Sequence, residues 1–81
     1  MQTFTQCTRS ALDCARRHGL EAAIHALVLP GDTHVDDHVE LKGTHGPVTF
    51  IVRSRCWLVD ATGTLRLRIE LDHPPRPSGL R

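Results

Sequence analysis

Residues 64–71 carry large aliphatic side chains that alternate with charged ones. The aliphatic members are Leu65, Leu67, Ile69 and Leu71, and the charged members between them are Arg66, Arg68 and Glu70. A period of two places these sets on opposite faces of a β-strand, one buried and one solvated. The segment therefore predicts a sheet that is covered on one face only.

An N-terminal helix is expected to provide the cover. Thr3 followed by Gln6 is a capping-box pattern. Gly19 suits the left-handed position just past a helix end, and Leu20 suits the hydrophobic contact of a Schellman turn. At 100° per residue, one face of the intervening helix gathers mostly small side chains, namely Cys7, Ala11, Cys14, Ala15 and His18. Such a face lets a helix approach a sheet closely.

The rest of the chain supplies further strands. Residues 21–29 are ambiguous, because three alanines favour a helix whereas the apolar side chains alternate, and we interpret them as a buried strand. A weaker alternation predicts a strand over residues 33–42. Residues 48–52 and 56–60 are predicted to form a hairpin whose tip is the polar segment 53–55.

These elements predict an α+β fold, in which the N-terminal helix packs on an antiparallel sheet of about four strands. Residues 1–72 are expected to form a single domain, because a chain this short buries only about 60% of its unfolded surface and holds one core. Residues 43–47 are predicted to be a turn. Residues 73–81 are rich in proline and predicted to be a flexible tail.

Charge and cysteine content narrow the expected partners. Ten basic residues against nine acidic ones leave a formal charge of +1, so nucleic acid is not an expected partner. No apolar run approaches the roughly 20 residues of a membrane span, so no membrane partner is expected. Three cysteines without paired spacing indicate reduced thiols and a cytoplasmic location.

The first cysteine has a chemical interpretation. In the first turns of the expected helix, Cys7 would lie in the positive field of the helix dipole, which favours the thiolate. A nearby imidazole could hold its proton, and a carboxylate could orient the ring. Across the expected hairpin Val48 would face Asp60, which places His45 near that carboxylate. His38, at the head of a strand-like segment, is the alternative base.

A helix that bears this cysteine ends at His18-Gly19-Leu20, and a strand, a histidine and the sequence Trp57-Leu58-Val59-Asp60-Ala61-Thr62 follow. His45 lies fifteen residues before Asp60. This order resembles the transglutaminase-like branch of the papain-like cysteine enzyme superfamily, whose motif is Trp-x-x-Asp-x-Thr.

The resemblance implies a thiol-dependent acyl transfer from an amide, without a cofactor or a metal. The reaction would be peptide or amide hydrolysis, deamidation or crosslinking. Cys7 would be the nucleophile, His45 the base and Asp60 the residue that orients it. Gln2 or Gln6 is the candidate for stabilising the oxyanion.

The same residue types also have structural interpretations. Free cysteines are among the most buried residues, so Cys7 suits a core as well as a site. Asp60 is typical of a turn, because aspartate side chains accept hydrogen bonds from amides two residues on. On a strand, His34, Asp36 and His38 would share a face and could bind zinc or nickel.

A non-catalytic protein-interaction module is the second functional hypothesis. An inhibitor or accessory protein of a bacterial mobile element would recognise a protein or peptide partner through its sheet face or an exposed edge strand. A domain this small also leaves apolar strand surface that a homodimer or a partner would bury.

Overall fold

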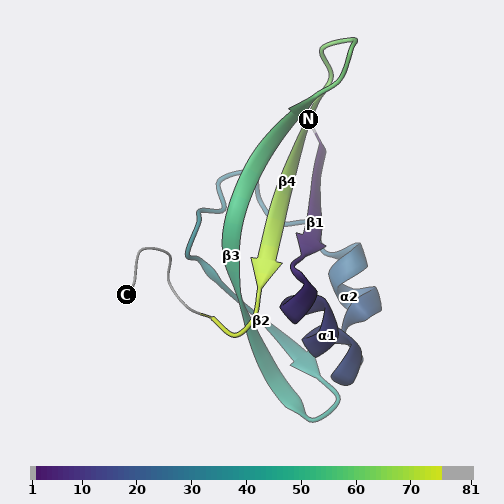
Figure 1. Cartoon of the computed structure of the whole chain (residues 1–81), viewed down its shortest axis with the longest axis vertical. Coiled ribbons are helices and arrows are strands. Elements are labelled where there is room, and N and C mark those ends of the chain that lie inside the picture. The colour runs from purple at the N-terminus through teal and green to yellow at the C-terminus, as the bar shows by residue number, and fades with distance from the viewer. Residues whose placement is uncertain (1, 76–81) are drawn as a thin grey trace.

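The computed structural model describes residues 2–75, so most of the predicted tail lies outside the described residues. Within this range the chain forms four strands and two short helices (Figure 1), which are β1 (Gln2–Cys7), α1 (Arg9–Arg17), α2 (Glu21–Ala26), β2 (His38–Gly43), β3 (Gly46–Val59) and β4 (Leu65–Asp72). These elements confirm the predicted α+β class. Neither helix is long and apolar enough to cross a membrane.

The strands form one curled sheet in the order β1-β4-β3-β2. Strand β4 pairs with β3 in the antiparallel direction, and β3 pairs with β2 in the same way. Strand β1, however, runs parallel to β4. The sheet is therefore mixed rather than antiparallel throughout, and the first and last strands of the described residues are neighbours.

Strand β1 takes the place of the first turns of the predicted helix. Its alternate residues lie in register with the buried residues of β4, in the pairs Thr3–Leu67, Thr5–Ile69 and Cys7–Leu71. Threonine and phenylalanine favour extended backbone, and pairing with β4 outweighs the local capping pattern. The prediction that Thr3 begins a helix was wrong, because five residues after it remain in or beside the strand.

Helix α1 begins later, and Thr8 is its N-cap. The Thr8 hydroxyl accepts a hydrogen bond from the Ala11 N–H at 3.2 Å and donates one to Asp72 Oδ1 at 2.6 Å. The C-terminal end agrees with the prediction, since Gly19 adopts a φ of 68°. The Leu20 N–H donates to the carbonyl five residues back at 2.8 Å, which is the Schellman hydrogen bond.

Residues 21–26 form α2, so the prediction of a strand over residues 21–29 was wrong. Three alanines favour the helix. Leu20 and Ile24, four residues apart, both turn into the core. The buried residues therefore lie on a single face at helical spacing. A buried strand would instead have buried side chains on both of its faces.

Strand β3 runs unbroken through residues 53–55, where a hairpin tip was predicted. Its register with β4 shifts between Val52 and Ser54, which marks a β-bulge. The polar side chains of this segment therefore accompany a bulge and not a turn. The turn predicted over residues 43–47 is confirmed in its position, because Gly43 of β2 pairs with Gly46 of β3.

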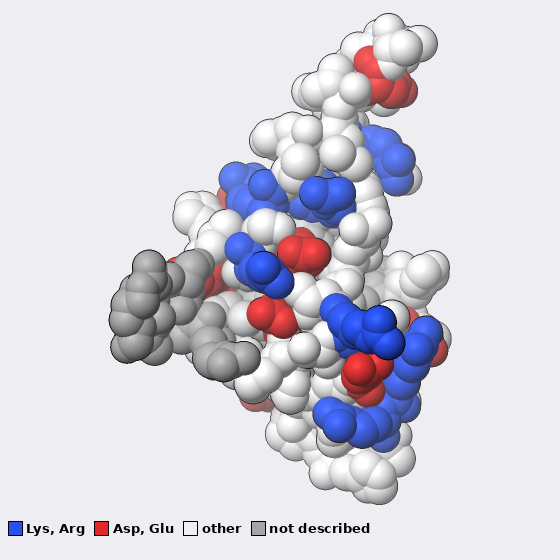
Figure 2. Space-filling view, in the orientation of Figure 1, with Lys and Arg blue, Asp and Glu red and all other residues white. Residues whose placement is uncertain are grey.

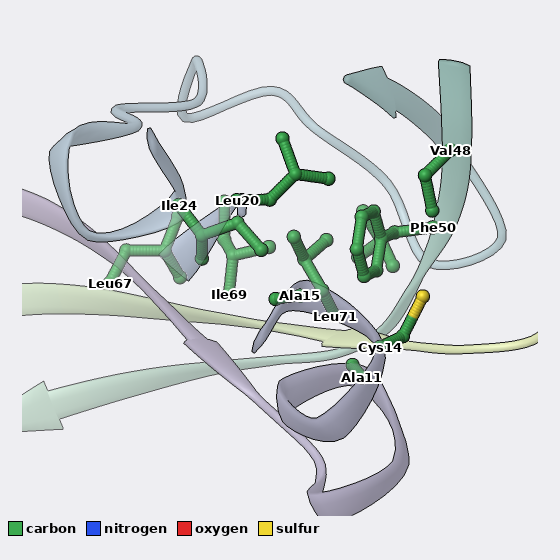
Figure 3. Packing of buried hydrophobic residues seen from close by; sticks show 11 residues of the cluster. Ala11, Cys14, Ala15, Leu20, Ile24, Val48, Phe50, Leu67, Ile69 and Leu71 are labelled. Atoms are coloured by element: carbon green, nitrogen blue, oxygen red, sulfur yellow. The ribbon is translucent and has the colours of Figure 1, made fainter. Parts of the chain in front are cut away.

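The core lies between the two helices and one face of the sheet (Figure 3). Helix α1 contributes the small side chains Ala11, Cys14 and Ala15, which are all buried. The strands contribute the large ones, chiefly Phe50, Val52, Leu67, Ile69 and Leu71. The three α1 residues of the predicted small-residue face are confirmed as buried, whereas Cys7, which was predicted to share that face, belongs to β1.

Candidate functional site

Cys7 is the last residue of β1 and lies before the N-cap of α1, not within the helix. It is half-buried and lines a pocket of about 320 Å³ together with Leu12, Ile24 and His25. Burial raises the pKa of the Cys7 thiol, and the charge of Glu70 raises it further. The thiol is thus kept protonated at neutral pH, whereas a nucleophile requires the opposite shift.

His45 and Asp60 lie at opposite ends of β3. His45 is in the turn before the strand, where its ring stands edge-on to His18 with 6.1 Å between the centroids. Asp60 follows the last residue of the strand, whose 14 residues span roughly 45 Å when extended. Val48 pairs with Leu41, not with Asp60. The predicted contact between this imidazole and this carboxylate is therefore wrong.

The Asp60 carboxylate is used by its own turn. It accepts hydrogen bonds from the Thr62 hydroxyl at 2.7 Å, the Thr62 N–H at 2.9 Å and the Thr64 N–H at 3.0 Å. These hydrogen bonds lower the pKa of Asp60, with the Thr62 hydroxyl making the largest contribution. Asp60 thus has the turn-forming role that was the alternative to orienting a base.

His38, the alternative base, begins β2 and pairs with Ile51. Strands β4 and β3 separate it from Cys7, so about 14 Å of sheet lies between the two backbones. Gln2 and Gln6 alternate with Cys7 along β1 and project from the other face of the sheet. The described residues therefore contain no assembled Cys-His-Asp arrangement.

The segment that was considered for metal binding is a loop up to His38. The His34 N–H donates to Asp37 Oδ2 at 2.8 Å, and the Asp36 N–H donates to the Val52 carbonyl at 2.8 Å. Because the strand does not extend over residues 34–36, the expected alternation on one face is absent. Within residues 2–75 no group of three or more potential metal ligands comes together.

The outer edge of β3 is the most distinctive unoccupied surface. Strand β2 pairs with β3 only as far as Ile51, and loop residues Asp36 and Asp37 then bond to the backbone of Val52. Beyond the bulge, the described residues place no strand against the outer side of β3, which pairs only with β4 over residues 54–59. In Figure 1 this part of the sheet extends upward past both helices to the 60–64 turn.

The hydrogen-bond pattern shows which backbone groups point outward. The Asp60 N–H donates to the Thr64 carbonyl at 3.2 Å, so Asp60 faces β4. Residues of an antiparallel pair alternate between facing the partner strand and facing away. Arg55, Trp57 and Val59 therefore direct their backbone N–H and C=O groups to the open side. This open row of the residues from Arg55 to Val59 is called the β3 edge below.

Apolar side chains stand beside the β3 edge. Trp57 lies opposite buried Leu67, and Val59 lies opposite Leu65, so these side chains share the helix-bearing face of the sheet. They lie beyond the cover of the helices, with 46% of Trp57, 63% of Val59 and 44% of Leu65 exposed. The side chains of a neighbouring strand would pack beside such residues, and here they form an apolar strip next to unpaired backbone.

The sequence contained a signal for this surface that the prediction of a hairpin tip at residues 53–55 obscured. Residues 56–59 read CWLV, a β-rich run that ends at a turn. The strand predicted over residues 64–71 follows directly after the turn at residues 60–64. Pairing these two runs as a hairpin would have predicted the observed contact between β3 and β4.

Comparison with family models, with curated proteins and with solved structures finds no match to this chain.

Proposed function

We propose that this protein is a non-catalytic interaction module that binds an extended segment of a protein partner along the β3 edge. The observation that carries the proposal is the pairing of residues 54–59 on one side only, beside the exposed Trp57 and Val59. An added strand would gain main-chain hydrogen bonds from the edge and apolar contacts from the strip, which is the physical basis of β-strand addition.

The placement of the thiol supports this choice over catalysis. Acyl transfer requires the nucleophile and its base within hydrogen-bond reach. Cys7, His45 and Asp60 belong to three separate parts of the sheet, and burial disfavours the Cys7 thiolate. The module would need no cofactor, because recognition rests on backbone groups and apolar surface.

Most of the edge lacks the usual protection of exposed strands. Natural sheets blunt their edges with proline, lysine, inward-pointing charges or bulges. The bulge between Val52 and Ser54 lies below the β3 edge. Residues 56–59 contain none of these, and only Arg55 at the lower end carries a charge, with its guanidinium donating to the Gly31 carbonyl at 2.6 Å. An edge left open in this way is suited to pairing with another chain.

A selection from a displayed library of random peptides tests the proposal. Selected peptides should slow hydrogen exchange at the amides of Arg55, Trp57 and Val59. Val59→Pro should weaken binding about ten-fold, because proline removes one edge donor of about 1 kcal/mol and its ring obstructs the approach. Val59→Thr is the matched control, since it keeps the N–H and the branched side chain.

Two results would contradict the proposal. One is a selection that yields no binding peptide. The other is a set of peptides that bind Val59→Pro as tightly as the unchanged protein, since these would occupy another surface. Circular dichroism of both variants verifies the fold, which an edge proline is expected to preserve because the Val59 N–H makes no ladder hydrogen bond.

A further inference from the structure

The charge around the β3 edge differs from that of the rest of the chain. The hairpin of residues 55–69 contains three arginines, Arg55, Arg66 and Arg68, against a single acidic residue, Asp60. It therefore carries a formal charge of +2, whereas the whole chain carries +1 and the remainder −1. Figure 2 shows basic side chains across the upper part of the sheet, with acidic ones above, between and below them, and a second basic group in the lower part of the molecule.

The single acidic side chain in this hairpin keeps its charge, but it lies beyond the upper end of the β3 edge. Asp60 lies in the turn, where its carboxylate accepts three hydrogen bonds from Thr62 and Thr64. Just below the hairpin, Arg53 and Glu70 add opposite charges, and Glu70 accepts a hydrogen bond from Ser54 at 3.2 Å. The loop that bonds to Val52 and Arg55 also brings Asp32, Asp36 and Asp37 to the lower end of the edge. The positive charge of the hairpin is therefore least offset farther up, at Arg66 and Arg68.

The arginines are close enough to act on an added strand. Arg55 is on β3 itself, opposite Ile69 and so on the apolar face, where its guanidinium donates to the Gly31 carbonyl. Arg66 and Arg68 lie on the other face of β4, opposite Leu58 and Cys56, one strand spacing of about 4.8 Å further in. A strand on the β3 edge would lie about 10 Å from their backbones, which is close to the screening length of about 8 Å at physiological salt. The Arg66 guanidinium is farther away, because it extends over the Phe4 ring of β1, 4.4 Å from its centroid.

We infer that the natural occupant of the β3 edge is an extended acidic segment, in which apolar side chains alternate with aspartate or glutamate. Its apolar side chains would pack beside Trp57 and Val59, and its acidic side chains would lie on the opposite face of the sheet, which carries Arg66 and Arg68. A second copy of this chain fits less well, because it would bring a hairpin of charge +2 against another of charge +2. This inference rests on the proposed function and adds the chemistry of the partner.

Three synthetic peptides of about nine residues test the inference. They share alternating valines and differ only in the residues between them, which are all glutamate, all serine or all lysine. Trp57 is the sole tryptophan, so its fluorescence reports binding directly. At about 50 mM salt the glutamate peptide should bind about ten-fold more tightly than the serine peptide, and the lysine peptide should bind most weakly. At about 500 mM salt the difference should shrink several-fold.

A pair of charge variants locates the effect. Arg66→Gln with Arg68→Gln should abolish the preference for glutamate and leave the affinity for the serine peptide within about two-fold, because both residues lie on β4 and outside the β3 edge. Arg9→Gln with Arg17→Gln changes the net charge equally on the exposed side of α1, and it should leave the preference intact. Loss of the preference in both double variants would overturn the inference, because the net charge and not the edge would then select the peptide.

The remaining outcomes separate this inference from the proposed function. Equal binding of the glutamate and serine peptides, with both weakened by Val59→Pro, would overturn the acidic partner and leave the edge function standing. A lack of any Val59→Pro-sensitive binding, including that of library-selected peptides, would overturn both. A dimer that sedimentation equilibrium detects and that Val59→Pro dissociates would make a second copy the occupant and overturn the acidic partner alone.

Discussion

The Thr8 hydroxyl lies 2.6 Å from Asp72 Oδ1, and this hydrogen bond joins the N-cap of α1 to the last residue of β4. The same hydroxyl accepts the Ala11 N–H, so one side chain both begins the helix and ties it to the sheet. Thr8→Ala should lower the free energy of unfolding by about 1–2 kcal/mol. Urea unfolding followed by Trp57 fluorescence measures the loss. Thr8→Ser keeps the hydroxyl and should lose less than half as much, and an equal loss in both variants would contradict this role.

Gly19→Ala should destabilise the protein for two reasons. The φ of 68° disfavours any residue with a Cβ, and that Cβ would lie 2.8 Å from Thr44 Oγ1. Gly63→Ala is the matched control, because Gly63 also has a positive φ of 84° but has open space around its Cβ position. Backbone strain alone costs about 1–2 kcal/mol. In urea unfolding Gly19→Ala should lose more than Gly63→Ala, and the reverse order would show that the contact with Thr44 is easily relieved.

Cys7 should react slowly with iodoacetamide. Its pKa is raised above the ordinary 9.0, by burial first and by Glu70 second, so the reactive thiolate is scarcer in the folded protein than in the unfolded chain. Peptide mapping after labelling at pH 8 should show slower modification of Cys7 in buffer than in concentrated urea. Since the unfolded thiol ionises first as pH rises, folding stability should decline above about pH 9. Rapid labelling of Cys7 at pH 6 would instead support the thiol-enzyme hypothesis.

Asp60 should stabilise its turn in a pH-dependent way. Hydrogen bonds from Thr62 and Thr64 lower the pKa of its carboxyl below the ordinary 3.8. The contribution is therefore present above about pH 3.8 and is lost as the pH falls through the lowered value in the folded protein. The difference in melting temperature between the unchanged protein and Asp60→Ala should be larger at pH 6 than at about pH 2. In an NMR titration, Thr62→Val should move the pKa of Asp60 upward, and an unchanged pKa would contradict the assignment to the Thr62 hydroxyl.

Local patterns were sufficient where one strong signal stood alone. The alternation of residues 64–71 predicted β4, and Gly19 with Leu20 predicted the end of α1, because a period of two and a left-handed glycine depend little on distant residues. Competing signals led to errors. In residues 21–26 the helix preference of the alanines outweighed the apolar alternation that had suggested a strand. In residues 2–7 pairing with β4 outweighed the helix-capping pattern of Thr3 and Gln6.

The candidate site was beyond such reasoning for a geometric reason. Treating residues 53–55 as a hairpin tip brought His45 and Asp60 together, whereas a bulge in a continuous strand places them at its two ends. The bulge depends on the register between β3 and β4, which no short segment encodes. The outward direction of the Trp57 and Val59 backbone groups follows from the same register and could not be derived before it was known.

The central position of β4 has a consequence for how the chain acquires its structure. Strand β4 supplies Leu67, Ile69 and Leu71 to the core and holds β1 and β3 together, yet it leaves the ribosome after both of them. Until it emerges, β1 has no neighbour and the inner edge of β3 is as open as the outer one. Strand β3 alone therefore has two open edges during synthesis, and the finished fold keeps the upper part of one of them open.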